Sequence, residues 1–232
     1  QKATIQQNWF KDRKWGIFIH YLSQAQNGEG DFHNTVGHAT DWNACVEMLD
    51  TDLLASRLAE IRAGYLVFTM MQGSKYFCAP NETYERLTGL ARGEGTCRRD
   101  LIADLIKSLD RYDIPLFLYY TGDGTYMDPE VMQGLYGRAA EIGSDKDHVT
   151  LPFAQKWAAI MEEYAVRYGD KIKGWWVDGM YPSIGYENFQ YLELFKNAAR
   201  KGNPDALFAA NYYGCFDDTK PWGEEHVEGV GN

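Results

Sequence analysis

The sequence predicts an α/β fold of the (β/α)8-barrel class, built around a parallel sheet. Five short apolar runs alternate with segments whose apolar residues recur every three or four positions, the pattern of strands alternating with helices. The runs are apolar throughout, as expected of parallel strands that are covered on both faces. Long loops follow the first three runs, on the side where such folds build their sites. We expect residues 1–232 to form a single barrel-like domain.

Each element is predicted from its local pattern. Residues 14–21 form a compact, aromatic-rich strand, and residues 65–70 form a second strand after Gly64, which ends a helix over 41–63. The other expected elements are strands over 115–120, 172–177 and 207–213 and helices over 98–110, 152–168 and 186–200. The apolar stripe that predicts the first helix consists of Leu49, Leu53, Leu54, Leu58 and Ile61.

The spacing of the strands favours a barrel over a doubly wound sheet. The strands start too far apart for a compact doubly wound domain, and no GxGxxG or GxxxxGKS/T motif follows any of them. A full barrel takes about 250 residues with short loops, and five strands with long loops already occupy this chain. We therefore expect an incomplete or open barrel. Its closure would come from a longer chain or an oligomer, or the sheet stays open.

The composition excludes several classes of function. The net charge of -10 and the pI near 5.0 argue against nucleic acid or an anionic membrane as the main partner. No apolar run approaches the roughly 20 residues of a membrane span, and the mean hydropathy is -0.46. The histidines are scattered without an HExxH spacing, so we expect no metal and no cofactor. Aromatic residues make up 15% of the chain, which hints at a carbohydrate partner.

The first residue and the cysteines bear on the compartment. The chain begins at Gln1 rather than Met, which indicates a processed N-terminus and a periplasmic or extracellular protein. Cys78 and Cys97 flank one loop and are expected either to pair in an oxidising compartment or to remain free buried thiols. The triplet from Asn81 to Thr83 fits a glycosylation sequon, a pattern that also occurs often by chance.

Asp178 is the sharpest candidate for chemistry. It ends a buried apolar strand, follows two tryptophans and precedes Gly179, and a carboxylate in that place is costly unless it is paired or functional. At the carboxyl end of a barrel strand it would point into the site, where it could attack an electrophilic carbon. The alternative is a structural Asp that caps the following turn, because Asp-Gly is a common turn pair.

Polar and aromatic residues follow each predicted strand. Tyr119, Tyr120 and Asp123, for example, end or follow the third strand. The residues that we expect to bind substrate are His20, Tyr21, Gln72, Tyr76, Tyr120, Trp176 and Asn211. Each of them taken alone is equally consistent with an ordinary core or surface position.

Glycoside hydrolysis needs a second carboxylate, because one acts as nucleophile or base and the other as acid. Glu224 and Glu225 lie downstream of the fifth strand, where the next loop would rise over the site. We expect one of them to be the acid/base, against the alternative of a solvated acidic tail. Asp123, Asp217 and Asp218 are rival candidates.

Three segments resemble the α-L-fucosidases of glycoside hydrolase family 29. Residues Trp9 to His20 are similar to that family's opening strand, Trp175 to Gly179 are similar to its nucleophile strand, and the helix start at 99–102 also matches. The resemblance covers essentially the whole chain. It implies a catalytic barrel with a retaining, exo-acting α-L-fucosidase mechanism, with Asp178 as nucleophile, His20 as a ligand to sugar hydroxyls, and a fucosylated or related glycan as substrate.

The chain departs from that family at two sugar contacts. Where the family has a Lys-His-His-Asp-Gly-Phe run after its second strand, this chain has Met71 to Tyr76 without a histidine. After His20 it continues with Tyr21 and Leu22 in place of Trp-Gly. These departures leave two alternatives beside the fucosidase: a carbohydrate-binding protein without turnover, and a glycosidase for another sugar.

Overall fold

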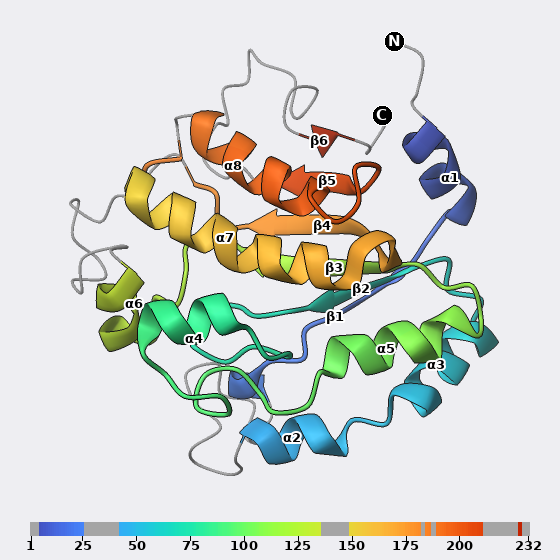
Figure 1. Ribbon diagram of the computed structural model, residues 1–232. Coiled ribbons are helices and arrows are strands. Elements are labelled where there is room, and N and C mark those ends of the chain that lie inside the picture. Colours follow the sequence, from blue (N-terminus) through green and yellow to red (C-terminus); the bar gives the residue numbers. More distant parts are fainter. Residues whose placement is uncertain are drawn as a thin grey trace.

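The computed structural model describes residues 5–25, 42–135, 149–181, 184–186, 189–210 and 227–228. Their six-stranded sheet has the order β1-β2-β3-β4-β5-β6 (Figure 1). The strands are β1 (Ile17–Ile19), β2 (Leu66–Thr69), β3 (Leu116–Thr121), β4 (Ile172–Asp178), β5 (Leu207–Ala210) and β6 (Val227–Glu228). β1 to β5 are parallel, whereas β6 pairs antiparallel with β5. The predicted parallel α/β architecture is confirmed, and among these strands the barrel is open.

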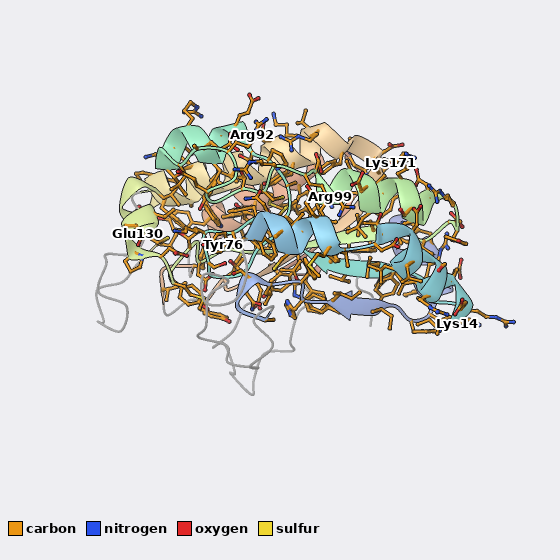
Figure 2. The ribbon with its side chains drawn as sticks, turned by 90° about the horizontal axis from the view of Figure 1, so that it is seen from below. Lys14, Tyr76, Arg92, Arg99, Glu130 and Lys171 are labelled. Carbon is orange, nitrogen blue, oxygen red and sulfur yellow. The ribbon has the colours of Figure 1, made fainter. Side chains whose placement is uncertain are left out.

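Helices connect the successive parallel strands. They are α1 (Ile5–Arg13), α2 (Trp42–Met48), α3 (Thr51–Glu60), α4 (Glu82–Thr88), α5 (Leu101–Asp110), α6 (Pro129–Leu135), α7 (Leu151–Tyr168) and α8 (Phe189–Arg200). α4, α5 and α7 lie in front of the strands in Figure 1 and above them in Figure 2, so they cover one face of the sheet. This is the outer face of the barrel.

The main core fills the space between this outer face and the helices. Trp157 of α7 is fully buried there and donates a hydrogen bond from Nε1 to the carbonyl oxygen of Thr121 at 2.5 Å. Its ring stacks on Phe153, with ring centroids 5.8 Å apart. Most of the largest fully buried side chains are aromatic. Much of the aromatic content therefore builds this core, which weakens the sequence-based hint of a carbohydrate partner.

Tyr120, predicted to bind substrate, belongs to this core. Its side chain is fully buried on the outer face of β3, and its hydroxyl donates a hydrogen bond to the carbonyl oxygen of Trp157 at 3.1 Å. The prediction chose the wrong one of two adjacent tyrosines, because successive side chains of a strand point to opposite faces. Tyr119 is the one on the inner face.

Capping side chains decide where the helices begin. Asp50 accepts a hydrogen bond from the backbone N–H of Leu53 at 2.9 Å and starts α3, so the helix predicted over 41–63 is two helices. Leu53 and Ile61, placed on its buried stripe, are each 51% exposed. The other predicted helices are present: α5 begins three residues later than predicted, α7 begins one residue earlier, and α8 is described from Phe189. Helices α1, α4 and α6 were not predicted.

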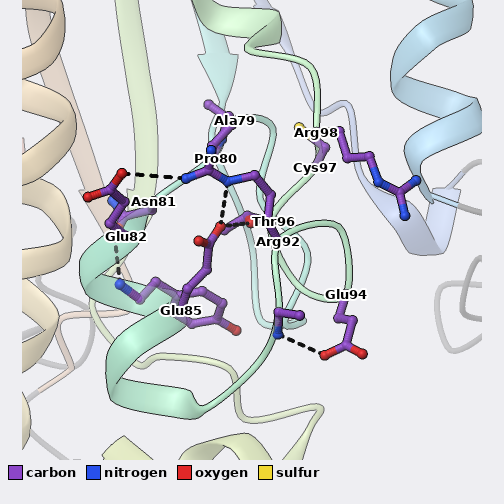
Figure 3. A network of polar contacts seen from close by, with 12 residues as sticks. Ala79, Pro80, Asn81, Glu82, Glu85, Arg92, Glu94, Thr96, Cys97 and Arg98 are labelled. Carbon is purple, nitrogen blue, oxygen red and sulfur yellow. Dashed lines mark hydrogen bonds and ion pairs between the residues drawn. The ribbon is translucent and has the colours of Figure 1, made fainter.

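Helix α4 lies in the long loop after β2 and holds that loop in place (Figure 3). Glu85 accepts a hydrogen bond from the Thr96 hydroxyl at 2.5 Å, and Arg92 bridges Glu85 and Glu82 at 3.4 and 3.7 Å. Asn81 caps the helix through the backbone N–H of Tyr84 at 2.7 Å. Asn81 is fully buried, so its amide is not accessible for glycosylation in the folded protein.

The cysteines of the described region are thiols. Cys45, Cys78 and Cys97, the cysteines that the structure describes, are buried and not in disulfide bonds. The Cys78 thiol lies 3.3 Å from the carbonyl oxygen of Thr69, and burial raises its pKa well above the ordinary value. Of the two alternatives for Cys78 and Cys97, the structure therefore shows the buried thiols.

Candidate active site

The inner face of the open barrel carries a second, smaller apolar cluster. Its buried members are Val67, Phe117, Tyr119 and Leu207, and the side chains packed against it are Trp9, Phe10, Tyr65 and Trp176. Strand register aligns these residues, because Val67 pairs with Phe117, and Tyr119 pairs with Trp176. The rings of Trp9 and Phe10 from α1 lie 6.0 and 5.5 Å from that of Phe117. This apolar cluster lies on the inner face of the sheet, next to the carboxyl ends of the strands, where the polar side chains of the candidate site lie.

Asp178 stands at the carboxyl end of β4, where the sequence places it, and its two carboxylate oxygens receive different donors. The Tyr119 hydroxyl donates a hydrogen bond to Oδ2 at 2.6 Å, and the backbone N–H of Gly179 donates one to Oδ1 at 2.8 Å. Bonds of this kind to an ionised acceptor are short and strong. They hold the carboxylate in one orientation at the end of β4, and a nucleophile must be oriented toward the carbon that it attacks.

Tyr119 is suited to donate to this carboxylate. Its side chain is 2% exposed. Burial, followed by the hydrogen bond to Asp178 and the charges of Asp178 and Asp123, raises the pKa of Tyr119 far above its ordinary value. The hydroxyl therefore keeps its proton across the accessible pH range. In turn it accepts a hydrogen bond from Nε2 of Gln72 at 3.1 Å.

His20 lies at the end of β1, and Thr69 of β2 fixes which of its nitrogens carries the proton. The Thr69 hydroxyl donates its single hydrogen to the carbonyl oxygen of Ile19 at 3.0 Å. It must therefore accept from Nδ1 of His20, which lies 2.9 Å away. Desolvation lowers the pKa of His20, and the charge of Asp178 opposes that shift. The neutral ring thus presents Nε2 as a hydrogen-bond acceptor, as binding of a hydroxyl group requires.

Aromatic rings surround His20. Its ring lies 4.4 Å from that of Phe18 and 4.9 Å, edge to face, from that of Tyr119. Trp176, also predicted to bind substrate, packs 5.5 Å from Phe18 on the same inner face. Phe18 is 40% exposed, so this group offers an aromatic surface beside the Asp178 carboxylate.

Asp123 brings a second carboxyl group close to Asp178. It is 8% exposed, and an ideal Cβ on Gly179 would lie only 2.8 Å from its Cγ. Gly179 also has a φ of 72°, so both the backbone conformation and the packing of Asp123 require glycine there. Of the carboxylates that the sequence offers as partners for Asp178, Asp123 is the one in the described region.

Two other predicted substrate contacts pack against the main core instead. The Tyr21 hydroxyl donates a hydrogen bond to the carbonyl oxygen of Cys45 at 2.6 Å. Tyr76 is half-buried beside Lys75, whose Nζ lies 5.7 Å from its ring centroid. Three further candidates, Asn211, Glu224 and Glu225, lie outside the described residues, as do Asp217 and Asp218.

The sequence did not identify Thr69 as a site residue, the close packing that requires glycine at position 179, or the donor role of Tyr119. Tyr119 stood beside the chosen Tyr120, but the run from Leu116 to Thr121 is buried at every position, so no alternation of polarity marks its inner face. The only available signal was spacing. Tyr119 pairs in register with Trp176, two residues before Asp178, and that register is a tertiary property.

A cavity of about 520 Å³ lies at the opposite end of the sheet, lined by the amino ends of β3 and β4 and by the segment before β5. Asp110 and Lys171 form an ion pair at its wall, with a separation of 2.6 Å. In barrels of this kind the amino ends of the strands serve stability. We therefore place the candidate site at the carboxyl ends.

Two features with functional meaning are absent from the described residues, a membrane-spanning helix and a metal-binding cluster. No helix among them is long and apolar enough to cross a membrane. No group of three or more His, Cys, Asp or Glu side chains in the same part of the chain could hold a metal ion.

The fold and site together define an open (β/α) barrel with an oriented carboxylate at its mouth. No protein-family model and no curated protein matches the chain. Among solved structures, an α-L-fucosidase GH29 from Bacteroides thetaiotaomicron matches with a TM-score of 0.64 and 17% identity, over 90% of this chain and 48% of its own. A mutant of the α-L-fucosidase AlfC matches with a TM-score of 0.61 and 17% identity, over 89% of this chain and 70% of its own.

A third solved structure broadens the comparison. The endo-fucoidan hydrolase MfFcnA4, from glycoside hydrolase family 107, matches with a TM-score of 0.56 and 18% identity, over 74% of this chain and 30% of its own. The chain spans about half the length of the fucosidase from Bacteroides thetaiotaomicron and of a bacterial fucosidase solved with an iminocyclitol inhibitor. At these identities the likeness shows the fold, and the fold is that of fucosidase-like glycoside hydrolases.

Proposed function

We propose that this protein is a retaining glycoside hydrolase that removes a terminal α-L-fucosyl or closely related sugar. One observation carries the proposal. On a fold shared with fucosidases, the Asp178 carboxylate is held by Tyr119 and Gly179 at the carboxyl end of β4. His20 stands at the end of β1, and its ring lies 4.9 Å from that of Tyr119, the residue that donates to Asp178; this proximity supports a shared site.

In the first step Asp178 attacks the anomeric carbon of the sugar. The bond between that carbon and the leaving oxygen breaks as a general acid gives the oxygen its proton. The product of this step is an ester between Asp178 and the sugar. In the second step the residue that acted as general acid becomes a base and takes a proton from water, whose oxygen bonds to the anomeric carbon. The ester bond between Asp178 and that carbon breaks, and its electron pair returns to Asp178.

We propose Glu225 or Glu224 as the acid/base, with Asp123 as the rival. Retaining enzymes hold the two carboxyl groups about 5 to 5.5 Å apart. Asp123 is near Asp178 but is 8% exposed, and a group that gives a proton to a leaving group must reach it. The low exposure of Asp123 therefore weighs against it, and we propose one of the two glutamates that follow β5 in the sequence.

The first test measures hydrolysis of aryl α- and β-glycosides, led by the α-L-fucoside, by the wild type and by Asp178→Ala. We expect turnover in the wild type and a loss of about a thousandfold or more in the variant. Asp110→Ala is the matched control, because it removes a carboxylate at the other end of the sheet, where it pairs with Lys171. Activity that survives in Asp178→Ala would reject Asp178 as the nucleophile.

Trapping of the intermediate provides a second, independent test. The fucosidase from Bacteroides thetaiotaomicron has been solved as a covalent intermediate formed with 2-fluoro-fucosyl fluoride. We expect the same reagent to label Asp178, as seen by peptide mass spectrometry. Alanine variants of Glu224, Glu225 and Asp123 then identify the acid/base, because its loss slows poor leaving groups far more than activated aryl groups.

The residues after β2 bear on which sugar the site would take, because this stretch stands where the resembled family has two histidines. Met71 is 1% exposed, and its sulfur accepts a hydrogen bond from the Thr121 hydroxyl at 3.3 Å. Gln72 contacts Tyr119. This difference motivates a panel that includes galactosides and charged sugars. Binding by calorimetry without turnover or trapping would instead support a carbohydrate-binding protein.

A further inference from the structure

We propose that Gln72 is a positioning residue that acts on Asp178 through the Tyr119 hydroxyl. This inference rests on the proposed function and extends it to a residue that contacts Tyr119. The three side chains come from or follow three adjacent strands, β2, β3 and β4. They form a chain in which Gln72 Nε2 lies 3.1 Å from the Tyr119 oxygen, which lies 2.6 Å from Asp178 Oδ2.

Hydrogen-bond chemistry fixes the direction of this chain. The Tyr119 hydroxyl has one hydrogen, and the Asp178 carboxylate can only accept, so that hydrogen lies between them. The Tyr119 oxygen must then accept from Gln72, which requires the amide nitrogen and not the amide oxygen to face it. Each donor polarises the next, which strengthens the bond to the carboxylate.

Packing supports a positioning role. Tyr119 is 2% exposed, and its ring packs against those of Phe18 and His20, with centroids 5.3 and 4.9 Å away. This packing holds the ring in place, but the hydroxyl hydrogen can still rotate about the bond between the ring carbon and the oxygen. The Gln72 amide restricts that motion by occupying the lone-pair side of the oxygen.

The hydrogen-bond chain from Gln72 to Asp178 affects formation and hydrolysis of the glycosyl-enzyme differently. A hydroxyl bonds strongly to a carboxylate anion and weakly to the neutral ester that Asp178 becomes in the glycosyl-enzyme. The chain therefore stabilises Asp178 as a departing group in the second step more than it assists attack in the first. Its loss should lower kcat and also KM, because the glycosyl-enzyme accumulates, and leave kcat/KM nearly unchanged.

The test compares Gln72→Leu, Tyr119→Phe and the double variant, using an aryl glycoside with an activated leaving group. We expect kcat to fall about fivefold in Gln72→Leu and about thirtyfold in Tyr119→Phe, as typical for loss of a neutral and of a charge-assisted hydrogen bond. In the double variant the Gln72 substitution should add nothing further. Tyr120→Phe, on the other face of β3, is the matched control and should keep kcat within about twofold.

The alternative to a positioning role is that Gln72 contacts the sugar directly. In that case kcat/KM should fall in Gln72→Leu, and the substitution should have the same effect in Tyr119→Phe as in the wild type. Either result would overturn the proposal. Gln72→Glu is a second variant of matched size; its carboxylate would compete with Asp178 for the Tyr119 hydrogen, so it should lower kcat more than Gln72→Leu does.

A spectroscopic measurement separates this inference from the proposed function. The Tyr119 hydroxyl proton, held in a short bond and buried, should give a slowly exchanging downfield proton resonance that is absent in Tyr119→Phe. Gln72→Leu should shift it and speed its exchange whether or not any substrate is turned over. A wild type without hydrolysis would reject the proposed glycosidase function. A resonance that is absent in the wild type or unmoved by Gln72→Leu would reject the hydrogen-bond chain from Gln72 through Tyr119 to Asp178.

Discussion

Replacement of Gly179 by alanine tests the packing around the candidate nucleophile. Gly179 has a φ of 72°, and its ideal Cβ would lie 2.8 Å from Asp123 Cγ and 3.0 Å from each of the Asp123 oxygens. Gly89 at the end of α4 is a matched control, because its φ is 77° and a Cβ there would meet nothing within 4 Å. Both substitutions impose a left-handed conformation, and only Gly179→Ala also forces an atom into occupied space.

The two costs can be separated. A left-handed conformation costs an L-residue roughly 1 to 2 kcal/mol, which is the whole effect expected of Gly89→Ala. Overpacking against the buried Asp123 carboxyl adds about 1 to 3 kcal/mol. Gly179→Ala should therefore lower the free energy of unfolding by about 2 to 5 kcal/mol. At roughly 2 to 4 °C per kcal/mol for a chain of this size, its Tm should fall clearly further than that of Gly89→Ala.

Urea unfolding monitored by tryptophan fluorescence gives both free energies, and hydrolysis of the aryl fucoside gives the effect on the site. Gly179→Ala should also lower activity, because the N–H of residue 179 orients Asp178 Oδ1 at 2.8 Å. Gly89→Ala should leave activity unchanged. Equal losses of stability in the two variants would refute the close packing of Asp123 on Gly179.

Three further predictions concern His20 and Asn81. In Thr69→Val the Nδ1–H of His20 loses its acceptor, so ¹⁵N NMR should show the Nε2–H tautomer gaining population; an unchanged spectrum would contradict the assigned tautomer. Because desolvation lowers the folded pKa of His20 below its ordinary 6.5, its contribution to stability is present above about pH 6.5 and lost as the pH falls through the folded pKa. The urea midpoint of the wild type should drop on acidification more than that of His20→Asn, and parallel curves would argue against the shift. Asn81→Ala removes bonds to Tyr84 N and Ile160 O, and should cost about 2 kcal/mol in urea unfolding; a loss below about 0.5 kcal/mol would show that the buried cap contributes little.

Local patterns were sufficient for strands β1 to β5, for helices α5, α7 and α8, and for Asp178. Parallel strands buried by neighbouring helices need uninterrupted apolar runs, so β2, β3 and β4 were found at nearly their observed bounds. Asp178 was found because an ionisable group at the end of such a run is costly and must have a reason to be there. The capping role of Asp50 was readable in principle, since Asp before a helical segment is a strong start signal, but the continuous stripe of leucines concealed the break.

The partners of Asp178 could not be predicted in the same way. Tyr119 is 59 residues from Asp178 and 47 from Gln72 along the chain. Their contact depends on the register between neighbouring strands, and a shift of one residue would turn Tyr120 inward in place of Tyr119. Since β3 is buried on both faces, its sequence carries no polarity signal that distinguishes these two registers.

By itself, therefore, the sequence determined the order of strands β1 to β5, the helices α5, α7 and α8 and the strand-end position of Asp178. These follow from short-range hydrophobic periodicity and from the cost of burying charge. The tertiary structure alone decided that Tyr119 and not Tyr120 faces the site, that Thr69 sets the tautomer of His20, and that the Asp123 carboxyl lies against Gly179. The physical reason is that hydrogen bonds and close contacts depend on differences of about an ångström between segments far apart in the chain, and such distances are set only when the sheet and its helices pack together.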